Sequence, residues 1–312
     1  MKIITIETRQ RWGVVSVCLL VLVLGSANAQ TPVLSEPNTV QITWVANHGF
    51  QIADAGKKVM IDTLFTQGGP YPSPSVDTQT KMLQNQAPYN DVDVVLTTHG
   101  HADHFELNFA VEYLLQHPNV QFVGPAEVVA SIRNHADFNR IQATVTAAQD
   151  RTREVFNGID IESIGMGHHN SPKTQHFMYL IHINGMKILH VGDAAKEPSP
   201  LYENLALSDR KIDILMAPFG SDCSNWSVSA QGGPYIIRES IKPKHVILGH
   251  IPADWDTQRQ IQEKTQLLAA LPNISVSILP PQPCPGRLFT REAGLIVDYP
   301  IPGGPIENQT TR

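Results

Sequence analysis

The sequence predicts an α/β protein built from two similar halves, in which two β-sheets pack face to face and helices cover both outer faces, a four-layer αββα sandwich. Two observations support this prediction. Short apolar segments of strand length alternate with segments whose apolar residues recur at helical spacing. The same order, a run of strands followed by alternating strands and helices, occurs twice along the 312 residues. A sheet buries its apolar face against another layer, so two such halves pack sheet on sheet with the helices outside.

The first half begins with three short strands within about twenty residues, a spacing typical of a β-meander. The third strand ends in a carboxylate, Asp62, and a Gly- and Pro-rich loop at residues 68–75 follows it. A later strand at residues 92–96 is wholly apolar, which is typical of a strand buried on both faces. The strands of this half are expected at residues 40–45, 50–53, 58–62, 92–96, 120–123, 154–156 and 159–164, and its helices at residues 78–86, 107–115 and 126–134.

The second half opens with a hairpin around Asn184-Gly185, a dipeptide that favours a type I′ turn. Pro234 lies in the first turn of a predicted helix, where its missing N–H costs nothing. The strands of this half are expected at residues 177–183, 186–191, 212–217, 246–248, 275–279 and 295–297, and its helices at residues 234–241 and 258–271.

The N-terminal residues form a separate segment. Three basic residues precede an apolar stretch at residues 12–24, and Ala27-Asn28-Ala29 follows with small residues at the positions that determine cleavage. This pattern predicts a secretory signal peptide at residues 1–29, cleaved after Ala29, and therefore a secreted or periplasmic protein. The apolar stretch is shorter than the roughly 20 residues that cross a bilayer, so no stable membrane anchor is expected after cleavage.

Beyond the signal peptide, the sequence divides into a leader at residues 30–39, one domain at residues 40–300 and a polar tail at residues 301–312. Cleavage removes three basic residues and one acidic residue, which changes the formal charge from −6 to −8. Such a surface repels phosphate backbones, which excludes nucleic acid as a partner. Cys223 and Cys284 remain where a disulfide can form, and the sequence leaves open whether they pair or are two separate thiols. It also leaves the oligomeric state open.

A dense group of coordinating side chains, His-Gly-His-Ala-Asp-His at residues 99–104, directly follows the apolar strand. His99 and His101 point the same way in extended backbone, and Asp103 and His104 follow on the turn. Imidazole and carboxylate ligands suit zinc or a similar divalent ion. A solvated histidine-rich loop is the alternative, but clustered imidazoles without a metal would lose their solvation. The segment therefore predicts a metal site.

Residues 99–104 resemble the H-x-H-x-D-H signature of the metallo-β-lactamase superfamily, which carries it after an apolar strand. Four further segments resemble family motifs in the same order, namely Asn47-His48-Gly49-Phe50 with residues 58–62, Gly167-His168-His169, Val191-Gly192-Asp193 and residues 242–250. The resemblance covers residues 40 to about 297 and is specific because five ordered segments agree. It is nearest to the branch of ascorbate-lactonase-like and N-acyl-phosphatidylethanolamine phospholipase-like hydrolases.

The resemblance implies a metallo-β-lactamase fold with two divalent metal ions, of which zinc is expected and manganese or iron is an alternative. Carried over by position, one ion is bound by His99, His101 and His168, the other by Asp103, His104 and His250, with Asp193 between them. His169 is an alternative to His168, and His176 is a third candidate. Asp62 is expected to be a structural carboxylate, His190 to orient a ligand and His48 to line the pocket.

These assignments imply a secreted binuclear metallohydrolase that uses a metal-bound hydroxide on an ester, lactone, amide or phosphoester, with Asp103 or Asp193 handling a proton. The substrate is expected to be a small molecule or lipid-like. No G-x-S-x-G nucleophile motif competes with this interpretation. Two alternatives are an iron-dependent oxidoreductase similar to persulfide dioxygenases and a non-catalytic secreted metal-binding protein on the same fold.

Overall fold

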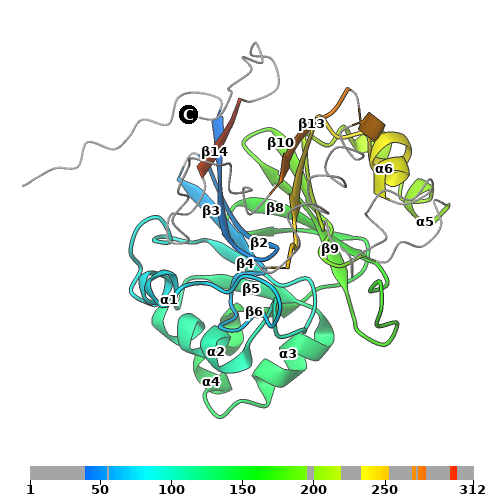
Figure 1. The fold of residues 1–312 in the computed structure, drawn as a ribbon. Helices are drawn as coiled ribbons and strands as arrows, with labels where there is room; N and C mark the ends of the chain where they lie inside the picture. Colours follow the sequence, from blue (N-terminus) through cyan, green and yellow to red (C-terminus); the bar gives the residue numbers. More distant parts are fainter. Residues whose placement is uncertain are drawn as a thin grey trace, which may run out of the picture. The chain divides into compact units, whose positions relative to one another are not determined.

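Two seven-stranded β-sheets form the centre of the fold (Figure 1). They are seen in a computed structural model. The structure describes residues 39–54, 56–194, 200–218, 233–252, 269–271, 273–278 and 296–300. All of these residues belong to one compact unit, residues 35–312. The first sheet contains, from edge to edge, β14 (Ile296–Pro300), β1 (Thr39–Ala46), β2 (Gly49–Asp54), β3 (Lys57–Ile61), β4 (Val94–Leu96), β5 (Gln121–Gly124) and β6 (Val145–Ala147).

The second sheet repeats the plan of the first. It contains, from edge to edge, β13 (Ser275–Ile278), β12 (His245–Gly249), β11 (Ile214–Pro218), β10 (Met186–His190), β9 (Phe177–Ile183), β8 (Ile159–Gly165) and β7 (Thr152–Phe156). In each sheet an antiparallel meander leads into parallel strands: β1 to β3 and then β3 to β6, and β7 to β10 and then β10 to β13. The predicted pair of similar halves is confirmed.

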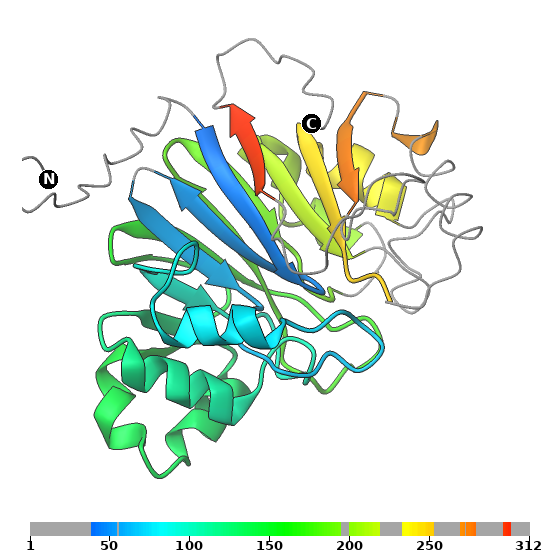
Figure 2. The same cartoon turned by 60° about the vertical axis from the view of Figure 1, so that its left-hand side comes forward.

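Helices cover the outer face of each sheet (Figures 1 and 2). Those on the first sheet are α1 (Val76–Leu83), α2 (Leu107–Gln116), α3 (Ala126–Arg133) and α4 (Phe138–Ile141). Those on the second sheet are α5 (Pro200–Glu203) and α6 (Gly233–Tyr235), which continues as a π-helical segment at Ile236–Ile241. Two short 3₁₀ segments lie at Gln142–Thr144 and Leu207–Arg210. The four layers of the predicted αββα sandwich are therefore present.

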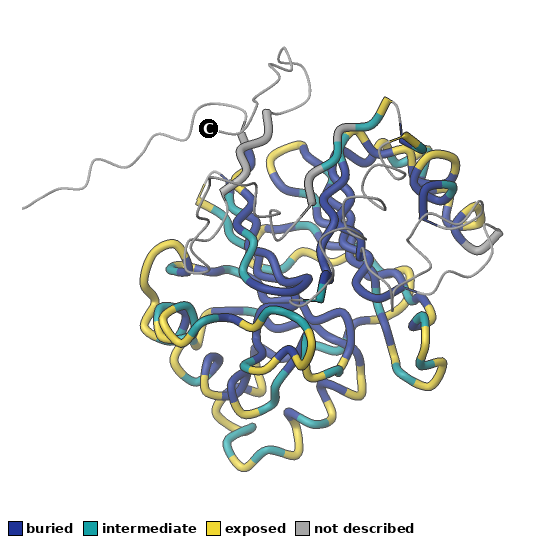
Figure 3. The backbone as a smooth tube through the Cα atoms, viewed as in Figure 1, coloured by how far each residue is buried: buried dark blue, intermediate teal, exposed yellow. Residues whose placement is uncertain are grey.

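Alternate side chains of the central strands enter different apolar layers, which explains their continuous apolar sequences. In β4, Val94 and Leu96 pack between the two sheets, whereas Val95 packs against the helices of the first sheet. In β11, Met216 faces the other sheet and Leu215 faces the helices of the second. The central strands are thus removed from water on both faces, as the buried strands in Figure 3 show, whereas the edge strand β7 is largely exposed.

The boundaries of α1 depend on a cap that the sequence pattern did not reveal. Ser75 Oγ accepts a hydrogen bond from the Thr78 backbone N–H at 3.1 Å, so the helix begins at Val76, before the predicted residue 78. It ends at Leu83, and Asn85 then adopts a left-handed φ of 53°. The predicted helical residues 84–86 are therefore outside the helix.

The assignment of three strands to halves was wrong. Residues 154–156 and 159–164, predicted as the end of the first half, lie in β7 and β8 of the second sheet. The last predicted strand lies in β14 and pairs with β1 of the first sheet, from Thr39 opposite Pro300 to Thr43 opposite Ile296. Periodicity identifies a strand, but its partner is set by long-range pairing that a local pattern does not contain.

Several further predictions differ from the described structure or lie outside it. The elements α4, α5 and β6 were not predicted from the sequence. The helix predicted at residues 234–241 changes to π-type pairing, in which the Lys242 N–H bonds the Ile237 carbonyl. The signal peptide, the polar tail, Cys223, Cys284 and most of the helix predicted at residues 258–271 lie outside the described residues. Within the described ranges, no helix has the length and apolar character needed to cross a membrane.

Ile181 tests the packing between the sheets. It is fully buried in the layer shared by both sheets. Ile181→Ala should lower the free energy of unfolding by about 2–5 kcal/mol, because the facing sheets cannot collapse onto the cavity. Ile181→Val should cost only about 0.5–1.5 kcal/mol. Urea unfolding followed by circular dichroism measures both, and an unchanged midpoint for Ile181→Ala would contradict the described interface.

Candidate metal centre

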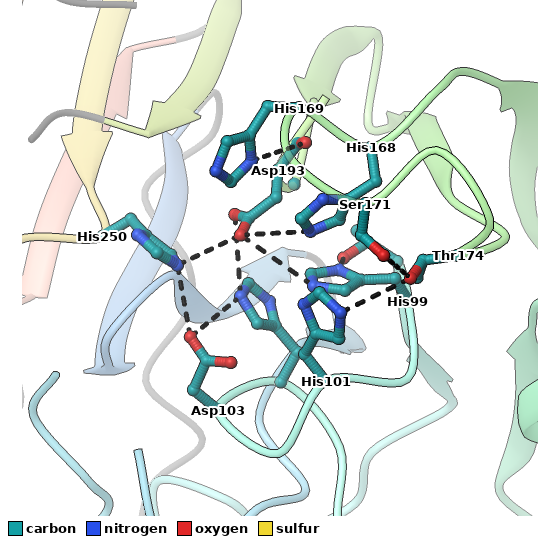
Figure 4. Close-up of polar contacts among 12 residues, drawn as sticks. His99, His101, Asp103, His168, His169, Ser171, Thr174, Asp193 and His250 are labelled. Atoms are coloured by element: carbon teal, nitrogen blue, oxygen red, sulfur yellow. Dashed lines mark hydrogen bonds and ion pairs between the residues drawn. The ribbon is translucent and has the colours of Figure 1, made fainter. Parts of the chain in front are cut away.

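The candidate site lies where several strands end at one edge of the paired sheets (Figure 4). The turn at residues 97–104 follows β4, His168 follows β8, Asp193 follows β10 and His250 follows β12. Carboxyl ends of parallel strands meet at one sheet edge, so residues far apart in sequence come together there. An antiparallel bridge between His168 and Ala194 holds two of these segments side by side.

Asp193 is the centre of the group. Its Oδ2 lies 3.9 Å from His99 Nε2, 3.7 Å from His168 Nε2 and 3.3 Å from His250 Nε2. Its Oδ1 lies 3.6 Å from His104 Nε2. One buried carboxylate therefore faces imidazoles contributed by both sheets.

The seven residues expected from the sequence to be ligands, together with His169, form overlapping groups in this centre. Within each group, one donor atom from every residue lies within 4.8 Å of the donor atoms of the others. The four groups are His99, His101 and His168; His99, His104 and Asp193; Asp103, His104 and His250; and His168, His169 and Asp193. Asp103 Oδ2 lies 3.2 Å from His250 Nε2 and 3.5 Å from His104 Nε2. The structure thus brings all seven predicted residues together.

Buried neighbours determine which ring nitrogen of two histidines faces the site. Asp62 Oδ2 accepts a hydrogen bond from Thr98 Oγ1 at 2.6 Å, so Thr98 Oγ1 is available to accept from His99 Nδ1 at 3.0 Å. The other histidine, His104, places Nδ1 2.9 Å from the same Asp62 Oδ2, which also accepts a hydrogen. Both rings therefore use Nδ1 for these hydrogen bonds and turn Nε2 towards the centre.

His169 and His176 are placed differently from His168. The His169 backbone N–H and Nδ1–H both donate to the Asp193 carbonyl, at 3.0 and 3.3 Å, while its ring stacks on His168 with centroids 4.6 Å apart. His176 is buried behind the group, with its ring centroid 5.4 Å from that of His99. His176 belongs to none of the donor groups found among the described residues.

The turn at Gly192 allows Asp193 to reach the centre. Gly192 has φ +51°, and a Cβ there would lie 2.6 Å from His176 Nε2 and 2.7 Å from Thr98 Oγ1. His190 Nδ1 accepts the Gly192 N–H at 3.1 Å, and its Nε2–H donates to the His48 carbonyl at 2.9 Å. His190 therefore anchors the turn, as expected. His48 is fully buried behind it rather than exposed in a pocket wall.

The electrostatics of the site favour positive charge. Burial by itself would raise the pKa of Asp193, but the charges of His250 and His104 outweigh it and hold this pKa well below its ordinary value. Asp103 has a lowered pKa for the same reason. Burial would lower the pKa of His104, yet Asp103, Asp193 and Asp62 together raise it to about 10. The carboxylates thus remain ionised and attract a cation.

The donor set fits a divalent metal. Nε2 of His99, His104 and His168 and Oδ1 of Asp193 are buried and have no hydrogen-bond partner among the described residues. A buried polar atom without a partner costs free energy, and coordination to a cation removes that cost. The donors are nitrogen and oxygen atoms, which zinc, manganese and ferrous iron accept.

Sequence reasoning missed three residues that support the site. Thr98 links Asp62 to His99, and Asn47 bonds Asp103 through its amide. Tyr71, in the Gly- and Pro-rich loop, packs its ring on that of His250 with centroids 4.0 Å apart. The Thr-Thr pair that precedes the histidine motif and the aromatic residue within the loop were the available signals.

The fold and this centre define an αββα protein with a buried His/Asp site able to hold metal. The chain belongs to the β-lactamase superfamily, because the family model described as "Beta-lactamase superfamily domain" matches residues 41–247. The resemblance found in the sequence is thereby confirmed at the level of the superfamily.

Comparisons with individual proteins agree with this membership. A UPF0173 metal-dependent hydrolase of Polynucleobacter asymbioticus is 24% identical over 297 residues, covering 88% of this chain and 95% of the relative. The structure of a metallo hydrolase from Ignicoccus hospitalis matches with a TM-score of 0.57 at 17% identity, covering 84% of this chain and 98% of that one. A diiron β-hydroxylase from Streptomyces venezuelae matches with a TM-score of 0.54 at 15% identity, covering 78% and 53%. The two structures share the fold.

Gly192→Ala tests the turn that carries Asp193. The added Cβ meets two buried side chains, so the variant should lose bound metal and melt at a lower temperature. Gly185→Ala is a matched control, because Gly185 has φ +76° and a Cβ added there would meet no atom within 4 Å. It should show only the backbone strain of about 1–2 kcal/mol and keep its metal. Elemental analysis and thermal unfolding measure both, and equal metal retention would contradict the close packing at Gly192.

Proposed function

We propose that this protein is a metal-dependent hydrolase that holds two divalent ions. The observation that carries the proposal is the position of the Asp193 carboxylate, which faces His99 and His168 on one side and His104 and His250 on the other at 3.3–3.9 Å. A carboxylate shared by two sets of imidazoles is suited to bridge two ions. The name of the relative from Polynucleobacter, a metal-dependent hydrolase, supports the same function.

In this proposal His99, His101 and His168 hold one ion and Asp103, His104 and His250 hold the other. His168 is preferred to His169 because only His168 lies in the donor group with His99 and His101, whereas His169 uses its Nδ1–H to bond the Asp193 carbonyl. His101 fits the same ion through Nδ1, since its Nε2 lies 3.5 Å from Thr174 Oγ1. Zinc is the expected metal, with manganese or iron as alternatives.

The ions, when bound, would polarise a substrate oxygen and lower the pKa of water. Asp193 orients both sets of ligands, and its side chain is only 4% exposed. Asp103 has 18% of its side chain exposed, so it is the carboxylate better placed to accept a proton from the attacking water and return it to the leaving group. Asp62 and Thr98 fix the orientations of His104 and His99.

We propose a small-molecule or lipid-like substrate with an ester, lactone, amide or phosphoester bond, as in the ascorbate-lactonase-like branch that the sequence resembles. The acidic composition opposes nucleic acid. Tyr71 supports an organic substrate, since its ring lies against His250 and gives the site an aromatic wall.

Asp193→Ala and His250→Ala test this centre. Each should lower the metal content by one equivalent and the turnover by at least about 100-fold. Substituting a residue that only supports a metal ligand can already lower activity by about 100-fold, and substituting the ligand itself should cost no less. Elemental analysis and assays on lactone, phosphodiester and β-lactam substrates measure both effects. Circular dichroism checks folding, and Asp193→Asn repeats the test with a side chain of nearly the same shape.

His182→Ala is the control, because His182 is a half-buried histidine near the C-terminal end of β9, whereas the N-terminal end of that strand pairs with His190 beside the site. It should keep its metal and its activity. Undiminished metal and turnover in either ligand variant would contradict the assignment. Iron with oxygen consumption would favour an oxidoreductase, and full metal without turnover on any substrate would favour a binding protein.

We also propose export, on the signal-peptide pattern of residues 1–29. The protein recovered from the periplasm or medium of an expressing bacterium should begin at Gln30. N-terminal sequencing and intact mass measure this, and full-length protein found only in the cytoplasm would contradict it.

A further inference from the structure

Asn47 connects two of the proposed ligands of the second ion. It is fully buried between β1 and β2. Its side-chain Nδ2 donates to both the Asp103 carbonyl and Asp103 Oδ2, each at 3.1 Å. Its own carbonyl accepts the backbone N–H of His250 at 3.4 Å. One residue therefore contacts a ligand from the turn after β4 and a ligand from the turn after β12.

The local structure holds Asn47 in this position. Its φ of 46° is left-handed, a conformation that asparagine adopts more readily than most residues with a side chain. Trp44 Nε1 donates to the Asn47 carbonyl at 2.9 Å, which fixes the peptide that His250 also contacts. The backbone of Asn47 is thereby fixed in the position from which its side-chain amide reaches Asp103.

The hydrogen bond selects one orientation of the Asp103 carboxylate. Asp103 Oδ2 receives the Asn47 amide and lies 3.2 Å from His250 Nε2. Without the amide, the Asp103 side chain, the more exposed of the two proposed carboxylate ligands, could rotate away from His250.

We propose that Asn47 is a positioning residue for the second ion, holding Asp103 and His250 at the separation that this ion needs. The proposal rests on the proposed binuclear function and deepens it, because it makes occupancy of one position depend on a residue that binds no metal itself. The first position is formed by His99, His101 and His168, and none of these three hydrogen-bonds Asn47 within the described part of the chain.

The test uses the Asn47→Gly variant of the mature protein, which begins at Gln30. The variant is titrated with Co²⁺, and binding is followed by visible absorption and calorimetry. Glycine adopts the left-handed conformation freely, so this change removes the amide without adding backbone strain. The variant should bind the first Co²⁺ as the wild type does and the second roughly 10–100-fold more weakly.

Asn157→Gly is the matched control. Asn157 also has a left-handed φ, 48°, and its Nδ2 donates to two carbonyls, those of Asp93 and Asn119, but it lies on the β7–β8 turn. The Asn157→Gly variant also loses two hydrogen bonds of a side-chain amide, but it should bind both Co²⁺ ions with wild-type affinity. Wild-type affinity for both ions in Asn47→Gly, or an equal loss in Asn157→Gly, would overturn the positioning role.

The wild-type titration separates this proposal from the one it rests on. Two Co²⁺ equivalents in the wild type with an unchanged Asn47→Gly variant would refute only the role of Asn47. A single equivalent in the wild type would refute the binuclear centre and the role of Asn47 with it.

Discussion

The burial of two carboxylates, Asp62 and Asp193, and of several imidazoles at one edge of two sheets is the constraint on which the rest of this centre depends. Charged and polar groups taken out of water destabilise a fold unless they are paired with one another or with a cation. Here Asp193 and Asp103 are paired with His104 and His250, while other imidazole nitrogens lack hydrogen-bond partners within the described ranges. This polar centre is compatible with a stable protein because apolar layers on both faces of each sheet surround it.

The sheets supply the precision that the centre requires. The donor residues lie on turns that directly follow strands, so their backbones are held by hydrogen-bonded neighbours. Several of these turns use left-handed backbone: Asp62 has φ 50°, Gly192 φ 51° and His250 φ 60°. Non-glycine residues in this region are strained, and such strain persists only where surrounding contacts enforce it. Contacts from Asn47, Tyr71 and Thr98 do so here by restraining His250 and Asp62.

Around the donors, a second set of side chains determines their orientation. Asp62 and Thr98 bond Nδ1 of His104 and His99, and His190 holds the peptide before Asp193. These supporting residues come from several turns of both sheets, so the centre forms only when the two sheets have docked. Metal binding and folding are therefore expected to stabilise each other.

Local patterns in the chain were enough to predict the αββα class, most strands, and the seven residues that converge, because strand and helix periodicity and ligand spacing are local properties. They also drew attention to His190 as a residue that orients a ligand, and in the structure it bonds the Gly192 N–H next to Asp193. Two features required the folded molecule: β7 and β8 join the second sheet, and β14 returns to β1. The roles of Asn47 and Thr98 also emerged there. These features depend on pairing and hydrogen bonds between residues far apart in the chain, and no local sequence pattern contains that information.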